Sequence, residues 1–273
     1  MFKIYDLDMK EITLPKGVMP LEIFVGSVAK NRVTEEVDGR AGVVDYGFNY
    51  TDRPVSLFLR IKAADKIDFR LLRNEVFAIF DVGSAFYVAE SDVPSRVLKV
   101  VVDESYIPDR LTEEYADFDI NCRTLDSVFW ETIYTTLELH DSGYAHSAEK
   151  YGLVDNIDDE KVKYRFTSNN FTVYNAGNVT VEPESMLLHI FVTSATGDSI
   201  TIKNNTTGEV FTLNRKMSAR HIQVNGMVVT DGTTQVFRDT NKRFISLAPG
   251  DNNITVSGVT FNEIRFNFKY LYK

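Results

Sequence analysis

The residues with the strongest potential for metal chemistry lie just past the middle of the chain. His140, Asp141, His146 and Glu149 offer nitrogen and oxygen ligands. Their spacing matches neither two histidines on one helix face nor a zinc finger. An exposed polar loop explains the four residues better, and we expect no metal site here.

An acidic run follows, with Asp155, Asp158, Asp159 and Glu160. A calcium-binding EF-hand loop needs oxygen ligands at positions 1, 3 and 5 and glycine at position 6. Counted from Asp155, position 3 would be Ile157 and position 6 would be Glu160. A solvated acidic loop is the better interpretation, and no cofactor is expected.

Enzyme signatures are missing from the 273 residues. No GxGxxG, GxxxxGK[ST], HExxH, GxSxG or CxxC motif occurs, which removes the usual signals of dinucleotide, phosphate, zinc-protease and hydrolase sites. A glycosidase acting on the cell wall remains an alternative, with Asp155 or Asp158 as candidate acids, because the separation of paired carboxylates is spatial. Nothing singles out a pair among 39 acidic residues. We therefore expect a protein that is not an enzyme and assign no catalytic residue.

Charge is distributed unevenly along the chain. Residues 1–167 carry 20 basic and 31 acidic side chains, a net −11, whereas residues 168–273 carry 10 and 8, a net +2. An acidic first part argues against wrapping or sequence-specific binding of DNA. It suits a passage through which DNA slides without sticking.

Composition is typical of a soluble globular protein, with 44% hydrophobic and 25% charged residues. The single Cys122 cannot form an intramolecular disulfide or a structural zinc site. The chain start lacks the pattern of a signal peptide, and no run of 18 apolar residues occurs. Membrane insertion is not expected.

The first half of the chain has the pattern of an α+β domain in which strands dominate. Strands are predicted at Phe2–Tyr5, Leu21–Val25, Val55–Ile61, Ala85–Ala89, Arg96–Val102 and Ala116–Arg123. Helical spacing of apolar residues predicts one amphipathic helix over Ala64–Phe80, with Asp65 as its N-cap. Asp38-Gly39 within Val37–Gly47 indicates the turn of a hairpin.

The second half is a series of short predicted strands, punctuated by Asn225-Gly226, Asp231-Gly232 and Pro249-Gly250. In the last strand Ile264, Phe266, Phe268 and Tyr270 alternate with polar neighbours, the pattern of a half-buried antiparallel strand.

We therefore predict a mainly β protein of two domains. Residues 1–165 form the α+β domain, and residues 166–273 form an antiparallel β-sandwich. The first domain includes a long connecting segment at about 124–163, our candidate for a projecting arm.

The ordered set of motifs is similar to that of the distal tail proteins of siphophages, the bacteriophages with long, non-contractile tails. In the first half the resemblance is carried by VDGRAG at Val37–Gly42, by Arg53 before the strand Val55–Ile61, and by the helix Ala64–Phe80. In the second half it is carried by FTVYNAGNVTVEP at Phe171–Pro183, ITIKNNTTGE at Ile200–Glu209, LAPGDNNITV at Leu247–Val256 and the closing strand Asn262–Tyr270. It covers nearly the whole chain and is weakest over 124–163.

The resemblance implies a structural virion protein at the tail tip, made in the host cytoplasm. Proteins of this family form a homo-oligomeric ring, usually a hexamer, that serves as a baseplate hub for host adsorption. The ring joins the tail tube protein to the tail-tip (tail-associated) protein, carries receptor-binding proteins and leaves a central channel for DNA ejection. The first domain makes the ring, and the second is a galectin-like or carbohydrate-module-like sandwich.

Family members have no catalytic residues. Only architectural roles are therefore assigned, to Gly39, Arg40, Gly42 and Arg53. The main alternative is a cell-wall carbohydrate-binding adsorption module in the C-terminal sandwich. Its aromatic rings, such as Phe266 and Phe268, are better explained as core, and the domain has no tryptophan.

Overall fold

The protein divides into two compact units in the computed structural model, which describes residues 1–143 and 157–273. Unit 1 is Met1–Trp130 with Lys273, and unit 2 is Glu131–Tyr272. The sequence-based boundary was placed after residue 165, whereas the compact units divide after residue 130, and described residues beyond that point pair with the end of the chain. The backbone N–H of Thr132, for example, donates to the carbonyl of Tyr270 at 3.1 Å.

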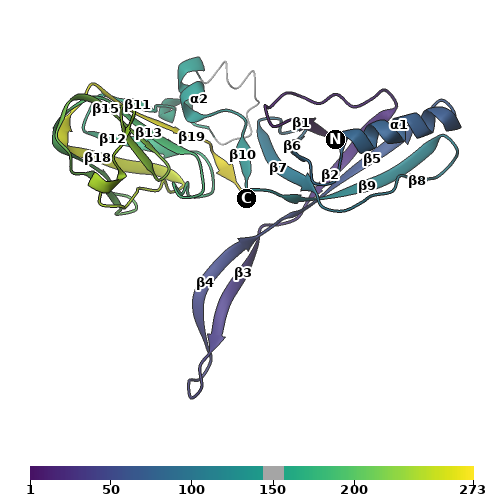
Figure 1. The fold of residues 1–273 in the computed structure, drawn as a ribbon, viewed down its shortest axis with the longest axis horizontal. Coiled ribbons are helices and arrows are strands. Elements are labelled where there is room, and N and C mark those ends of the chain that lie inside the picture. Colours follow the sequence, from purple (N-terminus) through teal and green to yellow (C-terminus); the bar gives the residue numbers. More distant parts are fainter. Residues whose placement is uncertain (144–156) are drawn as a thin grey trace. The chain divides into compact units, whose positions relative to one another are not determined.

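Unit 1 is built on an antiparallel sheet with strand order β1-β6-β7-β9-β5-β2 (Figure 1). Its strands are β1 (Phe2–Tyr5), β2 (Val18–Val25), β5 (Pro54–Lys62), β6 (Ala85–Glu90), β7 (Arg96–Val102) and β9 (Tyr115–Thr124), and the short β8 (Asp109–Arg110) pairs with β9. Every second residue of β5 is buried, and Leu57 and Leu59 are fully so. This alternation places one face of the sheet in the core.

The helix α1 (Lys66–Ile79) covers part of this core. Asp65 accepts hydrogen bonds from the backbone N–H groups of Ile67 and Asp68 at 2.7 and 2.9 Å, so the predicted N-cap is confirmed. Three apolar side chains of one helix face are buried: Phe69, Leu72 and Val76.

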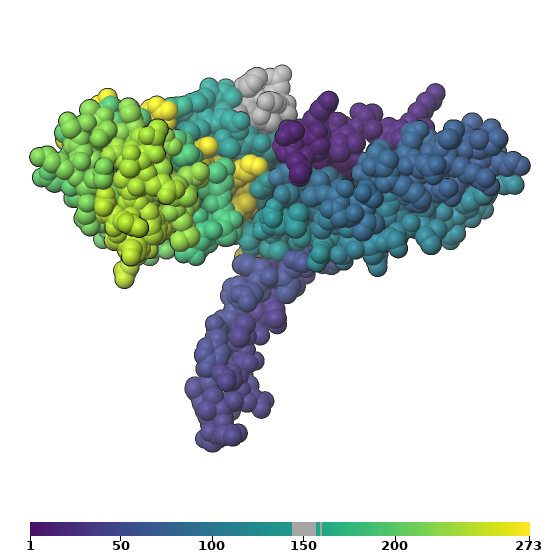
Figure 2. Space-filling model, in the orientation of Figure 1, coloured from purple at the N-terminus to yellow at the C-terminus, as the bar shows by residue number. Residues whose placement is uncertain are grey.

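Strands β3 (Ala29–Glu36) and β4 (Val43–Thr51) form a separate two-stranded sheet, which we call the arm. The arm leaves unit 1 between β2 and β5 and projects from it as a slender ribbon (Figures 1 and 2). The sequence analysis predicted only a hairpin around Val37–Gly47 and assigned the projecting arm to 124–163. The element that the structure shows projecting is residues 29–51, and residues 144–156 of the segment 124–163 lie outside the described residues.

Unit 2 consists of short elements arranged around one long strand, β13 (Leu188–Asn204). The elements before it are β10 (Trp130–Thr132), α2 (Thr136–Ser142), η1 (Asp159–Lys161), β11 (Arg165–Phe166) and β12 (Asn170–Asn175). Those after it are β14 (Val210–Leu213), β15 (Met217–Asn225), β16 (Val228–Asp231), β17 (Thr234–Gln235), η2 (Phe237–Asp239), β18 (Gly250–Thr260), β19 (Glu263–Phe268) and β20 (Leu271–Tyr272).

The long strand β13 pairs antiparallel with four partners. Its first half pairs with β15 and β19, and its second half pairs with β14 and β18. Register shifts between Val192 and Gly197 mark the change of partners. A Cβ at Gly197 would lie 2.4 Å from the carbonyl oxygen of Gly258, so only glycine allows this close crossing. The prediction of a mainly β chain with a β-sandwich and one amphipathic helix in the first domain is confirmed.

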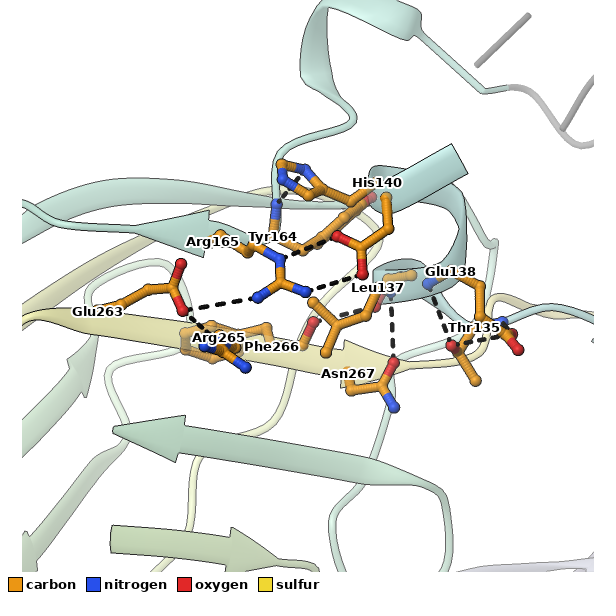
Figure 3. A network of polar contacts seen from close by, with 12 residues as sticks. Thr135, Leu137, Glu138, His140, Tyr164, Arg165, Glu263, Arg265, Phe266 and Asn267 are labelled. Atoms are coloured by element: carbon orange, nitrogen blue, oxygen red, sulfur yellow. Dashed lines mark hydrogen bonds and ion pairs between the residues drawn. The ribbon is translucent and has the colours of Figure 1, made fainter. Parts of the chain in front are cut away.

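Helix α2 is attached to β19 by polar contacts (Figure 3). Thr135 and Glu138 form a capping box at its start, and the backbone N–H of Leu137 donates to Oδ1 of Asn267 at 3.3 Å. Arg165 bridges Asp141, at 2.8 Å, and Glu263, at 3.6 Å. These contacts explain why the segment from residue 131 onward belongs to unit 2.

Candidate assembly surface

The arm is stabilised by contacts between its own two strands. Arg32 forms an ion pair with Asp45, and the hydroxyl of Tyr46 donates to Glu35 at 3.0 Å. The ammonium of Lys30 lies 3.8 Å from the ring centroid of Phe48. Cross-strand pairs of this kind each contribute modestly, on the order of 0.2–1 kcal/mol, so the ribbon by itself is only marginally stable.

Large apolar side chains of the arm face solvent. Six of them are 40–62% exposed: Val33, Val37, Val43, Tyr46, Phe48 and Tyr50. In the part of the chain that the structure describes, no other strand pairs with β3 or β4, so both edges of the ribbon are open. Open edges and exposed apolar side chains together make a surface suited to contact with another polypeptide.

Three of the four residues assigned architectural roles lie at the tip of the arm. Gly39 and Gly42 have φ of 81° and 87°, and a Cβ on either would meet no atom within 4 Å. Glycine is therefore favoured there by backbone conformation and not by packing. Arg40 is exposed between them, and its N–H donates to the carbonyl of Val37 at 3.1 Å.

The fourth residue, Arg53, lies at the root of the arm and is only 5% exposed. Its guanidinium donates to the carbonyl of Gly26 at 2.8 Å and to that of Val128 at 3.0 Å. Burial lowers the pKa of Arg53, although an arginine stays charged at neutral pH. Its backbone N–H also donates to Oγ1 of Thr124 at 2.9 Å. Arg53 thus joins the end of β2 to the segment after β9, where the arm begins.

Sequence reasoning missed other residues at the root. The ring of Tyr50 meets that of Phe129 edge-on at 5.0 Å. A Cβ on Gly26 would lie 2.8 Å from Cγ of Pro54, which makes glycine necessary for this close approach. The aromatic and β-branched residues of Val43–Thr51 were the available signal, because such residues favour strands.

A second exposed apolar surface of unit 1 lies on α1. Ile67 and Leu71 are 65% and 57% exposed. They are four residues apart, so they share one helix face, and it is not the face on which Phe69 and Leu72 are buried. Unit 1 therefore carries two separate apolar surfaces, the arm and this face of α1.

Unit 1 also has an open groove of about 890 Å³ whose lining includes Asp52, Asp103, Glu104 and Arg123. Arg123 forms ion pairs with Asp103 at 3.0 Å and with Asp52 at 3.6 Å. Glu104 accepts a hydrogen bond from the amide of Asn121 at 2.8 Å. These three carboxylates are therefore engaged in structural contacts.

Three of the residues considered for metal or acid chemistry, His140, Asp141 and Asp158, have other contacts in the structure. His140 contacts the backbone of Tyr164 (Figure 3) and that of Val162. Arg165 holds the pKa of Asp141 below its ordinary value. Asp158 caps η1. His146, Glu149 and Asp155 lie outside the described residues. Within residues 1–143 and 157–273, no group of three or more potential ligands is arranged to hold a metal ion.

Comparison with known protein families gives a match in the first half of the chain. Residues 7–122 match the family model of the phage tail protein RIFT-related domain. The resemblance to siphophage tail proteins that the sequence motifs indicated is confirmed.

The whole chain shares its fold with a solved phage protein. The crystal structure of Dit from phage SPP1, described as a paradigm of the hub adsorption apparatus in phages that infect Gram-positive bacteria, aligns at a TM-score of 0.68 with 12% identity. The alignment covers 99% of this chain and 100% of that one. A chain of the phage P2 baseplate in its activated conformation with Ca aligns at 0.44 with 10% identity over 98% and 97% of the two chains, too low to carry an argument. No curated protein matches the sequence.

The range that matches the family model contains every element of the candidate assembly surface. This range, 7–122, includes the arm, Arg53 at its root and the whole of α1. Neither of the two helices in the described residues is long and apolar enough to cross a membrane.

Proposed function

We propose that this chain is a structural virion protein of a siphophage tail tip. Copies of unit 1 close into a ring, of six subunits by analogy with the family, between the tail tube protein and the tail-tip protein. The ring leaves a central channel through which DNA passes without specific binding, and receptor-binding proteins attach to the assembly. The chain has no catalytic role in this proposal.

The arm is the observation that carries the proposal. A ring requires a heterologous contact, in which one surface of a subunit meets a different surface of the next. Unit 1 offers two such surfaces, the arm and the exposed face of α1. Burying apolar area contributes about 25 cal/mol per Å², so covering the six exposed side chains of the arm favours association.

Charge supports a channel that does not retain DNA. Residues 1–130 carry 16 basic and 23 acidic side chains, a net −7. Repeating this charge around a ring gives a strongly negative assembly, which repels phosphates during passage.

The test is native mass spectrometry of the full-length chain over a concentration series, followed by negative-stain imaging. The arm variant is Tyr46→Ser/Phe48→Ser. The matched control is Met227→Ser/Val228→Ser, which removes two side chains of unit 2 with 49% and 47% exposure. We expect closed rings with a central opening for the native chain and the control, and monomers for the arm variant.

Two results would contradict the proposal. One is an arm variant that assembles as well as the native chain. The other is a native chain that stays monomeric at every concentration and also when the tail tube protein of the same phage is added.

A further inference from the structure

Unit 2 carries a group of exposed cations that we call the basic patch: Lys216, Arg238, Lys242 and Arg243. Two neighbouring segments supply them. The backbone N–H of Asn214 donates to the carbonyl of Asp239 at 2.8 Å, and the backbone N–H of Asn241 donates to that of Thr212 at 2.9 Å. Residues 212–216 and 238–243 therefore run side by side, and the four cations share one region of the surface.

The cations of the basic patch make no ion pair with any described residue. The two acids nearest in sequence, Asp231 and Asp239, are engaged by Arg215 at 3.1 and 3.0 Å. Other cations of the chain are paired, for example Arg60 with Asp117 at 2.6 Å. In a protein of net charge −9, the patch is a local region of uncompensated positive charge.

Two aromatic residues, Phe237 and Phe244, flank three of these cations in the sequence. Phe237 and Phe244 are half-buried and stacked, with ring centroids 6.3 Å apart. Phe244 also stacks on the buried Phe211 at 5.7 Å, which fixes its orientation. Fixed ring faces next to cations are the combination that binds polymers in which phosphates alternate with flat or apolar ring surfaces.

We propose that the basic patch binds a phosphodiester-linked glycopolymer of the bacterial surface, with its cations on the phosphates and its phenyl rings against the sugars. Two of the four cations are lysines, which bind phosphate as mobile point charges and tolerate variable phosphate positions. A long DNA duplex bound at the patch would also lie against the rest of a protein whose net charge is −9. Repulsion of its phosphates disfavours duplex DNA as the ligand. Lysine is also depleted in protein interfaces, which disfavours a protein partner.

The choice of a bacterial surface polymer rests on the proposed tail-tip function, whereas binding of phosphodiesters by the patch does not. The two can fail separately. The Tyr46→Ser/Phe48→Ser variant keeps the patch, so it binds soluble glucosylated poly(glycerol phosphate) with the same affinity per chain whether or not it forms rings.

The experiment measures binding of the full-length chain to bacterial walls that carry glucosylated poly(glycerol phosphate), a phosphodiester polymer with sugar substituents. The same walls treated with hydrofluoric acid, which cleaves phosphodiesters, serve as the comparison. The patch variant is Lys242→Ser/Arg243→Ser. The matched control, Lys10→Ser/Lys16→Ser, makes the same change in net charge with two exposed lysines of unit 1.

We expect the native chain and the control to bind intact walls and to lose binding to stripped walls. The patch variant should bind at least fivefold more weakly. A plot of log Kd against log salt concentration should also be less steep for this variant. In nucleic acids each phosphate contact adds about 0.7–0.9 to that slope. Equal binding to stripped walls, or no loss in the patch variant, overturns the proposal. Single-stranded DNA that binds as tightly at equal phosphate concentration would assign the patch to nucleic acid instead.

Discussion

The arm and the sheet of unit 1 are built from the same kinds of residues but differ in burial. Strand β5 places Val55, Leu57 and Leu59 in the core at 2% exposure or less. Strand β4 ends at Thr51, just before β5 begins at Pro54, and it leaves Val43 and Phe48 at 53% and 43% exposure. Both strands therefore have a composition that favours β-structure, and only the presence of neighbouring strands decides which side chains are buried.

The difference is established at Arg53, where the two regions meet. On one side β5 pairs with β2 and β9 along its whole length. On the other side β4 has β3 as its only strand partner among the described residues. The stability of the fold should therefore reside in the sheet, and the capacity for assembly should reside in the arm.

The largest expected effect is that of Leu57→Ala in the sheet. Leu57 is fully buried, so the substitution leaves a cavity and should lower the free energy of unfolding by about 2–5 kcal/mol. Denaturant unfolding of the purified chain measures it. A loss below about 1 kcal/mol would mean that the sheet does not dominate stability.

Arg53→Met tests the connection between the two regions. It leaves the carbonyls of Gly26 and Val128 without their charged donor, which should cost about 1–3 kcal/mol. Ring formation should also weaken, because the root of the arm loosens. Arg123→Met, at a half-exposed arginine with two acidic partners, is the control. Equal losses in the two variants would remove any special role for Arg53.

Asp117→Asn in the sheet and Asp45→Asn in the arm together compare an ion pair of the sheet with one of the arm. Arg60 on β5 donates two hydrogen bonds to Asp117 on β9, at 2.6 and 2.7 Å, and these lower the pKa of Asp117. A lowered pKa in the folded state contributes stability above the ordinary Asp pKa of about 3.9, and this contribution is lost as the pH falls through the folded value.

The variant should therefore be modestly less stable than the native chain at pH 7, and the difference should disappear in acid. Urea unfolding across that pH range measures it. The arm counterpart, Asp45→Asn, removes the partner of Arg32 and should leave global unfolding unchanged. A larger effect of Asp45→Asn than of Asp117→Asn would reverse the comparison.

A similarly small effect on stability is expected for Phe48→Ser in the arm. Phe48 contacts only Tyr50 and Lys30 among the ring and cation contacts of the described residues, so the free energy of unfolding of the monomer should change by less than about 0.5 kcal/mol. Thermal unfolding at low protein concentration measures this. A large loss in the monomer would show that the arm packs on its own subunit.

Several elements could be predicted because their signals are local. The helical spacing of Leu72, Val76 and Phe80, together with Asp65, predicted α1 and its N-cap. The alternation of Ile264, Phe266 and Phe268 predicted the buried face of β19, where all three are fully buried. In both cases the side-chain period of the element is visible within a few residues.

The candidate site was predictable only in part. The glycines of Val37–Gly42 signalled the turn at the tip of the arm, because positive φ favours glycine. The role of Arg53 was not visible, since the carbonyls that it binds belong to residues 27 and 75 positions away. Residues 131–165 were placed in the first domain because no local pattern shows that Thr132, for example, pairs with Tyr270 near the end of the chain.

The sequence by itself determined the mainly β class, the single amphipathic helix of the first domain, the turns and the uneven charge, because each depends on residue type and short-range spacing. Only the tertiary structure decided that Val43–Thr51 projects while Pro54–Lys62 is buried. Both segments have the composition of a strand, and burial depends on which distant strands lie beside them. The same reason applies to the basic patch, whose two segments meet through long-range backbone pairing.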